Sequence, residues 1–217
     1  FLIRLIKNDT HNYLYLLAIA LAFSFYSKYS MIFLFTGIVM AFLLTSLRRW
    51  FLNAHLYFAG LLFLVLAAPN IYWQITHNFP VMTHMKMLND QLLVHVSRKQ
   101  FLIEQVLFNM PAFFVWISGL IFLFTDSIGR KYLSVAIVYF TTIAGLLFFN
   151  GKGYYSMGLY PTLFAMGGIK KEKWTTNKNL RNRMFRVSMP VIMLLLLIPI
   201  LPALIPLDTP QKLEKNY

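Results

Sequence analysis

The sequence contains no cysteine, which excludes a disulfide framework and a thiolate metal site. Acidic residues are also scarce, because 7 Asp and Glu stand against 20 Lys and Arg and leave a formal net charge of +13. Charged residues make up only 12% of the chain, about half the share usual in soluble domains. The composition therefore excludes an ordinary soluble globular domain.

Hydrophobic residues are abundant, at 59% of the chain with a mean hydropathy of +0.62. Apolar stretches of about 18 residues or more recur, and each has roughly the length that spans a bilayer. No alternating barrel pattern is present, so the spans should be helices. We expect an all-α, polytopic transmembrane helical bundle that forms a single transmembrane domain over residues 1–217. The opening "FLIRLIKND" has no initiator Met or signal-peptide pattern, so we expect the C-terminal part of a longer chain.

Seven apolar segments are predicted to cross the membrane: 12–26, 29–47, 56–73, 101–125, 132–149, 154–169 and 187–204. With alternating spans, 13 of the 20 Lys and Arg fall on one side, including the cluster at 170–186. The other seven are Lys28, Lys86, Arg98, Lys99, Lys152, Lys212 and Lys215. The richer side should be cytoplasmic, and topology and anionic lipids explain the positive charge without any nucleic acid.

This topology gathers three polar stretches on the outer face of the membrane. The first is Lys28 within "SFYSKYSM" (24–31), the second is the connection 74–100, and the third is the turn 151–155 within "NGKGYYSMGLYP" (150–161). A lysine at the centre of a span costs about 2.5–3.5 kcal/mol and less at the interface. Lys28 and Lys152 are therefore either snorkelling anchors among belt tyrosines or cations that meet a lipid phosphate.

The connection 74–100 carries three histidines. Val81, Met85 and Leu88 recur at helical spacing, which predicts an amphipathic helix lying on the membrane surface. On that helix His84 and His95 share a face but lie about 16 Å apart, too far to ligate one metal. A site built on His77 and His84 would need further ligands, so we expect no metal and no cofactor. Solvated interfacial His and Lys side chains are the plainer interpretation.

Glu104 and Gln105 lie just inside the fourth predicted span. An acid in that position usually faces the bundle interior or a water-filled cavity, so Glu104 is either an ion-pair partner, for instance of Lys152, or a catalytic group. Gly151 and Gly153 flank Lys152 and predict a tight reversal with positive φ. Such a reversal would present the lysine more firmly than a membrane anchor requires.

Taken in order, these stretches resemble the later membrane helices of bacterial family 39 glycosyltransferases, relatives of the protein O-mannosyltransferases and the lipid A aminoarabinose transferase. The resemblance covers most of residues 10–170. It is carried by "SKYSMIFLF", "NIYWQITHNFP", "EQ" at 104–105 and "GKGYY" at 151–155. It implies a GT-C fold in the bacterial inner membrane, with an outer-face site that takes its sugar from a polyprenyl-phosphate donor. The residues that the resemblance and topology nominate for lipid-phosphate or substrate binding are Lys28, Tyr29, His77, His84, Lys86, Glu104, Lys152, Tyr154 and Tyr155.

The sequence departs from that family at its catalytic aspartate, which lies in an external loop after the first transmembrane helix. No paired-acid motif is present here, so no catalytic residue is identified, and we expect the chain to be inactive alone. Neither the sugar nor the acceptor is indicated. The rival interpretations are a transporter or lipid flippase and a scaffold subunit without chemistry. A transporter would be favoured by inverted repeats or charges at the membrane midplane, whereas the charges here lie at span ends.

The predicted topology can be tested by cysteine labelling, because the chain has no cysteine of its own. Single cysteines at Lys152 and Asp90 should react with a membrane-impermeant thiol reagent in sealed cells, and one at Lys178 should not. Labelling at position 178 would overturn the orientation.

Overall fold

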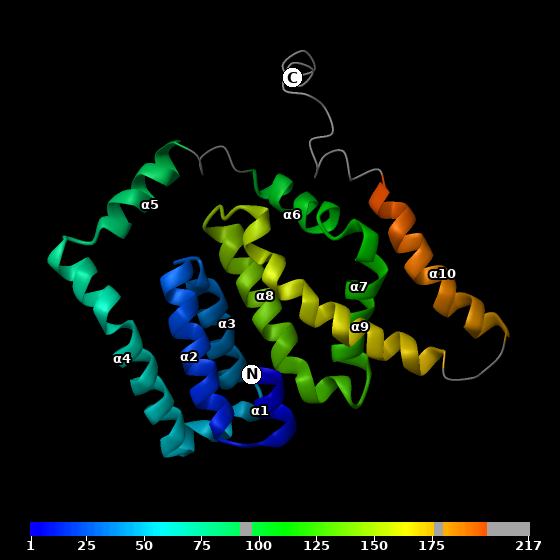
Figure 1. Ribbon diagram of the computed structural model, residues 1–217, viewed down its shortest axis with the longest axis horizontal. Helices are drawn as coiled ribbons and strands as arrows, with labels where there is room; N and C mark the ends of the chain where they lie inside the picture. The colour runs from blue at the N-terminus through cyan, green and yellow to red at the C-terminus, as the bar shows by residue number, and fades with distance from the viewer. Residues whose placement is uncertain (92–96, 176–179, 199–217) are drawn as a thin grey trace, which may run out of the picture.

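The computed structural model describes residues 1–91, 97–175 and 180–198, and every regular element within these ranges is a helix (Figure 1). The predicted all-α class is therefore confirmed. His95, Lys178 and the end of the seventh predicted segment lie outside the described residues.

The first half of the fold consists of α1 (Leu2–Asn8), α2 (Asn12–Ser27), α3 (Met31–Leu44), the 3₁₀ helix η1 (Ser46–Leu52), α4 (Ala54–Thr76) and α5 (Pro80–Gln91). The second half consists of α6 (Arg98–Leu107), η3 (Met110–Ala112), α7 (Phe113–Thr125), η4 (Gly129–Tyr132), α8 (Leu133–Phe148), η5 (Gly153–Leu159), α9 (Tyr160–Trp174) and α10 (Leu180–Leu197).

The long helices alternate in direction (Figure 1). Helices α2, α4 and α8 run toward one end of the molecule, and α3 and α7 return to the other. The α2–α3 turn, α5, α6 and η5 lie at the first end, which we call the site end. Helix α1, η1 and η4 lie at the opposite end. The described parts of the three polar stretches that the sequence assigned to one face are thus at one end of the molecule.

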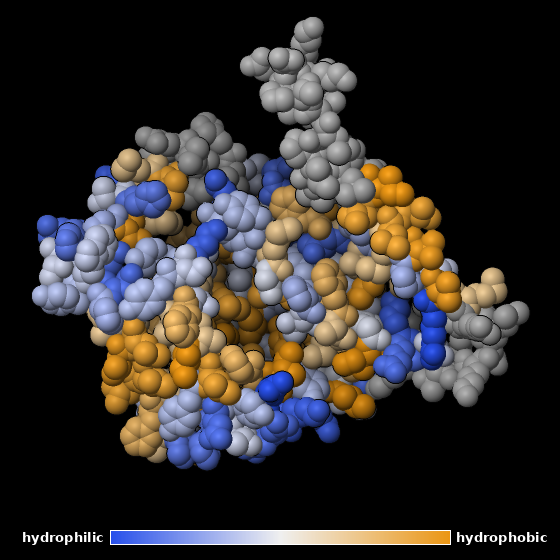
Figure 2. All heavy atoms as spheres, viewed as in Figure 1, coloured by the Kyte–Doolittle hydropathy of each residue, from blue (hydrophilic) through white to orange (hydrophobic). Residues whose placement is uncertain are grey.

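Among the described residues, fewer helices are long enough to cross a membrane than the seven expected over the whole chain. Two described helical stretches pass by length and composition, Ala54–Thr76 and Gly129–Phe148, and up to four pass if each of two bent pairs counts as one span. Helix α2 has 16 residues, so it covers about 24 Å, less than the roughly 30 Å hydrocarbon core. On the face in Figure 2, hydrophobic residues form a broad band between hydrophilic residues at the upper left and lower edge.

The fourth predicted segment, 101–125, is not one helix. Helices α6 and α7 are separated by η3 and bent by 62°. Pro111 lies at the start of η3, where it has no N–H to continue a helix, and the Asn109 side chain donates to the Gln105 carbonyl 3.0 Å away. A second break, of 91°, separates α3 from η1 at Thr45. At both breaks the chain changes direction. Helices η1 and α6 therefore do not continue the straight spans that hydropathy alone predicts.

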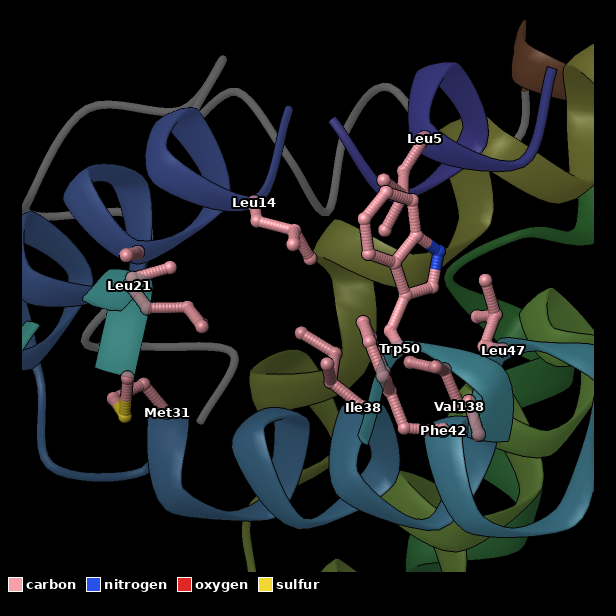
Figure 3. Close-up of a cluster of buried hydrophobic side chains, with 12 residues drawn as sticks. Leu5, Leu14, Leu21, Met31, Ile38, Phe42, Leu47, Trp50 and Val138 are labelled. Atoms are coloured by element: carbon pink, nitrogen blue, oxygen red, sulfur yellow. The ribbon is translucent and has the colours of Figure 1, made fainter. Parts of the chain in front are cut away.

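Two hydrophobic clusters hold the helices together. The first draws buried side chains from α1, α2, α3, η1, α4 and α8, and Figure 3 shows Leu5, Leu14, Ile38, Phe42 and Trp50 among them. The second joins α7, α8 and α9. Its buried members are Trp116, Phe122, Leu123, Val135, Ala136, Tyr139, Tyr160, Leu163 and Met166. Because α8 contributes to both clusters, it connects the two halves of the fold.

Helices α7 and α9 cross with their backbones in close contact. A Cβ atom added at Gly119 would overlap the Leu163 carbonyl, and one at Gly167 would overlap the Val115 carbonyl. Small residues of this kind allow membrane helices to approach closely. The adjacent Gly168 is different, because nothing lies within 4 Å of an added Cβ.

This difference gives a matched pair of substitutions. Gly167→Ala should destabilise the protein by about 1–3 kcal/mol, because the helices must separate to admit the methyl group. Gly168→Ala should be neutral or should stabilise by up to about 1 kcal/mol through helix propensity. Thermal unfolding in detergent measures both, and equal shifts for the two variants would refute the close crossing.

Candidate functional site

The α2–α3 turn and η5 meet at the site end through Lys28. Lys28 follows the last residue of α2 in extended conformation, and its side chain is exposed. The Lys28 ammonium nitrogen lies 3.7 Å from the centroid of the Tyr155 ring and 4.8 Å from that of Tyr154. An exposed cation over an aromatic face contributes about 0.5–1 kcal/mol. Lys28 is therefore in contact with two other residues predicted for the site, although they lie more than 100 positions away in the sequence.

Lys28 also lines a cavity of about 410 Å³ between the α2–α3 turn, α8 and η5. The polar lining comes from Ser24, Ser27, Lys28, Ser30, Thr142 and Tyr155. Ser24 and Thr142 donate their hydroxyls to carbonyls within their own helices, 2.8 and 2.7 Å away. Among the described residues neither the Ser27 nor the Ser30 hydroxyl has a hydrogen-bond partner. These two hydroxyls and the Lys28 ammonium are donors that a bound anion can use.

A second cavity, of about 180 Å³, adjoins the first. The two share Leu34, Gly158 and Leu159 in their linings. The remaining lining of the second is mainly apolar: Phe1, Leu2, Ile3, Val135, Val138, Tyr139, Thr162 and Leu163. Val135 and Val138 precede Thr142 and Leu146 along α8, so this cavity lies farther from the site end. Together the cavities offer a polar, cationic end and an apolar end.

The tyrosine beside Lys28 remains neutral. A tyrosine phenol keeps its proton at neutral pH, so no phenolate competes with an anion for the Lys28 ammonium. The positive charge of Lys28 remains available to a negatively charged ligand.

Gln105 fixes the position of η5, a role that we did not predict from the sequence. Its side chain is 5% exposed, and it makes four hydrogen bonds with described residues. The amide nitrogen donates to the carbonyls of Phe101 and Gly153, 3.1 and 3.3 Å away. The amide oxygen accepts from the hydroxyls of Ser156 and Tyr160. One sequence feature could have indicated this role: Gln105 and Asn109 are polar residues four positions apart, the spacing that places two side chains on one face of a helix.

The glycines flanking Lys152 have a different role from the one predicted. Neither adopts positive φ, and Asn150 takes the left-handed conformation instead, with φ 51°. Asparagine tolerates this region better than most residues, so the reversal does not need glycine. The glycines are required by close contacts: a Cβ at Gly151 would lie 2.7 Å from a Leu146 methyl, and one at Gly153 would overlap the Glu104 carboxylate.

Glu104 therefore packs against the η5 turn but does not form the suggested ion pair. Among the described residues no salt bridge joins it to Lys152, and its carboxylate accepts a long hydrogen bond, 3.4 Å, from the Gln100 side chain. Lys152 lies at the start of η5, half-buried, and is not among the residues that line the cavity.

Tyr29 is adjacent to Lys28 but contacts α4 instead of the cavity. Its hydroxyl donates to the Asn70 side chain at 3.1 Å and accepts from the Gln74 amide at 2.6 Å. Gln74 is buried, and its own oxygen accepts from the Val81 N–H at 3.3 Å. Tyr29 thus ties the α2–α3 turn to α4 and to the start of α5.

The three remaining candidates lie on the α4–α5 arm. His77 stacks on the Trp73 ring with centroids 4.6 Å apart. His84 and Lys86 are exposed on α5, and none of the three lines the cavity. Within the described ranges no group of three or more His, Cys, Asp or Glu side chains could hold a metal ion.

One comparison with known proteins gives a match. The family model for dolichyl-phosphate-mannose-protein mannosyltransferase matches residues 1–73, about a third of the chain. The match points to a membrane glycosyltransferase of the GT-C type. No curated protein and no solved structure matches the chain. The matched residues include Lys28 and Tyr29, whereas Glu104, Lys152 and the two tyrosines lie beyond them.

The contact between Gly153 and Glu104 makes a testable prediction. Gly153→Ala should destabilise the protein by about 1–3 kcal/mol, because the new methyl group overlaps the carboxylate. Gly158→Ala in the same 3₁₀ helix should cost much less, since nothing lies within 4 Å of its added Cβ. In a double-mutant cycle, Glu104→Ala should recover part of the loss in Gly153→Ala, because it removes the carboxylate but keeps the Glu104 Cβ, 2.8 Å from the new methyl group. Additive losses in thermal unfolding would show that the two residues do not touch.

Proposed function

We propose that this chain is part of a membrane glycosyltransferase that takes its sugar from a polyprenyl-phosphate donor. The cavity lined by Lys28 binds the donor's phosphate, and the adjoining apolar cavity receives the first part of its hydrocarbon chain. The transferase class is supported by the family match over residues 1–73. The site faces the outside of the membrane, in accordance with the distribution of Lys and Arg.

The observation that carries the proposal is the position of Lys28. Its ammonium lies over two tyrosine rings, and Lys28 lines a cavity that shares Leu34, Gly158 and Leu159 with an apolar one. A lipid phosphate has the same distribution of charge and apolar surface. An anchor lysine that only snorkels to the interface needs neither the cavity nor the unpartnered serine hydroxyls beside it.

The chemistry of the step explains why a cation is needed there. In glycosyl transfer from a polyprenyl phosphate, the bond between the anomeric carbon and the phosphate oxygen breaks, and the lipid phosphate leaves with an additional negative charge. A preorganised ammonium and hydroxyl donors stabilise that charge more than they stabilise the bound donor. No described residue is assigned as the base that activates the acceptor hydroxyl.

Binding of a short prenyl phosphate tests the proposal without requiring turnover. The protein in nanodiscs should bind farnesyl phosphate more tightly than farnesol, which has the same chain without the charge. Lys28→Met should lower the farnesyl phosphate affinity about tenfold, the size of one charge-assisted hydrogen bond, and leave farnesol binding unchanged. Lys99→Met provides the control, because Lys99 is an exposed lysine of the same end outside the cavity.

Equal affinities for farnesyl phosphate and farnesol in the wild-type protein would contradict the proposal. So would equal losses in the Lys28 and Lys99 variants, which would indicate attraction to surface charge in general.

Lys152→Ala, alone and combined with Lys28→Met, decides the role of Lys152. A further loss in the double variant assigns Lys152 to the phosphate, whereas a silent Lys152→Ala makes it a membrane anchor.

A further inference from the structure

We infer that Gln105 is a positioning residue for the phosphate site, through which α6 holds η5 and its tyrosines under Lys28. This inference rests on the proposed function. Gln105 does not line the cavity and touches no ligand-binding group directly. It acts through the turn that carries Tyr154 and Tyr155.

The hydrogen bonds of Gln105 reach both ends of the turn. Its amide nitrogen donates to the Gly153 carbonyl at the first residue of η5, and its oxygen accepts from Ser156 and from Tyr160, which begins α9. The single Ser156 hydroxyl hydrogen is shared between the Gln105 oxygen and the Gly153 carbonyl, whose oxygen lies 2.7 Å from the hydroxyl. Tyr154 and Tyr155 lie between these fixed points, so the backbone that presents their rings to Lys28 is held on both sides.

All the groups in this network are buried. Gln105, Ser156 and Tyr160 are 5%, 1% and 1% exposed. A side chain that lost one of these partners would leave a buried polar group unsatisfied, so the network favours one arrangement of the turn. Gly153 permits this close approach of α6, because a Cβ at that position would overlap the Glu104 carboxylate and lie 2.8 Å from the Glu104 Cβ. Helix α6 therefore fixes the position of Tyr154 and Tyr155 relative to the Lys28 ammonium.

Two substitutions of graded severity test this role. Gln105→Leu removes all four hydrogen bonds at similar volume, whereas Gln105→Glu keeps the two acceptor bonds and loses the donors. Asn109→Leu is the matched control, because Asn109 is buried two residues after the end of α6 and its side chain donates only locally, to the Gln105 carbonyl. The first readout is the ratio of the affinities for farnesyl phosphate and farnesol. We expect it to fall about five- to tenfold in Gln105→Leu, less in Gln105→Glu, and little in Asn109→Leu.

The second readout does not depend on the ligand. A single cysteine at Lys152, in a chain that otherwise has none, reports the exposure of the turn through its rate of reaction with an impermeant thiol reagent. Gln105→Leu should raise that rate several-fold over the parent, and Asn109→Leu should not. A changed rate without any preference for farnesyl phosphate in the wild type would keep the positioning role and reject the donor site. Equal effects of Gln105→Leu and Asn109→Leu on both readouts would overturn the inference, because they would show ordinary loss of core packing.

Discussion

The arrangement of the site depends on the close approach of α3 and α8. A Cβ added at Gly37 would lie 3.0 Å from the Val138 carbonyl and 3.1 Å from the Thr142 hydroxyl, and Gly145 is in contact with the Phe33 ring. The Thr142 hydroxyl lies 3.3 Å from the Phe33 carbonyl, which shares its hydrogen with the closer Val138 carbonyl. Because the backbones of α3 and α8 are in close contact, the α2–α3 turn and the turn after α8 lie at the same level along the axis of the helix bundle. Lys28 can therefore lie over Tyr155.

The packing of α3 against α8 leaves a cavity beside Lys28, where a ligand can contact the cation. Thr142 and Leu146 of α8 line the cavity with Lys28, and Val135 and Val138 line its apolar continuation. One helix thus connects a cationic entrance to an apolar interior along its length. The exposed Lys28 ammonium keeps its contact with the two tyrosine rings. Placing the Lys28 ammonium there costs little folding free energy, and a phosphate can neutralise its charge without moving it.

Part of this arrangement was predictable from the sequence, since composition requires helices and alternation places Lys28 and the 151–155 turn on one face. Which residues of that face contact one another could not be predicted. A predicted topology says on which side of the membrane a residue lies, and not which residues lie beside it there. His77, His84 and Lys86 share that face yet lie on the α4–α5 arm. The glycines beside Lys152 were misread because glycine serves both positive φ and close contact, and only the packing of Leu146 and Glu104 distinguishes the two. The break at Pro111 was hidden by continuous hydropathy.

The central claim is that the cavity beside Lys28 holds a lipid phosphate. An experimental structure of the protein in nanodiscs with farnesyl phosphate bound tests it most directly. The account predicts the phosphate within about 4 Å of the Lys28 ammonium, the distance of an ion pair, with the chain directed toward Val135 and Val138. A phosphate bound against the exposed basic side chains of α5 or α6, with the cavity beside Lys28 unoccupied, would contradict it.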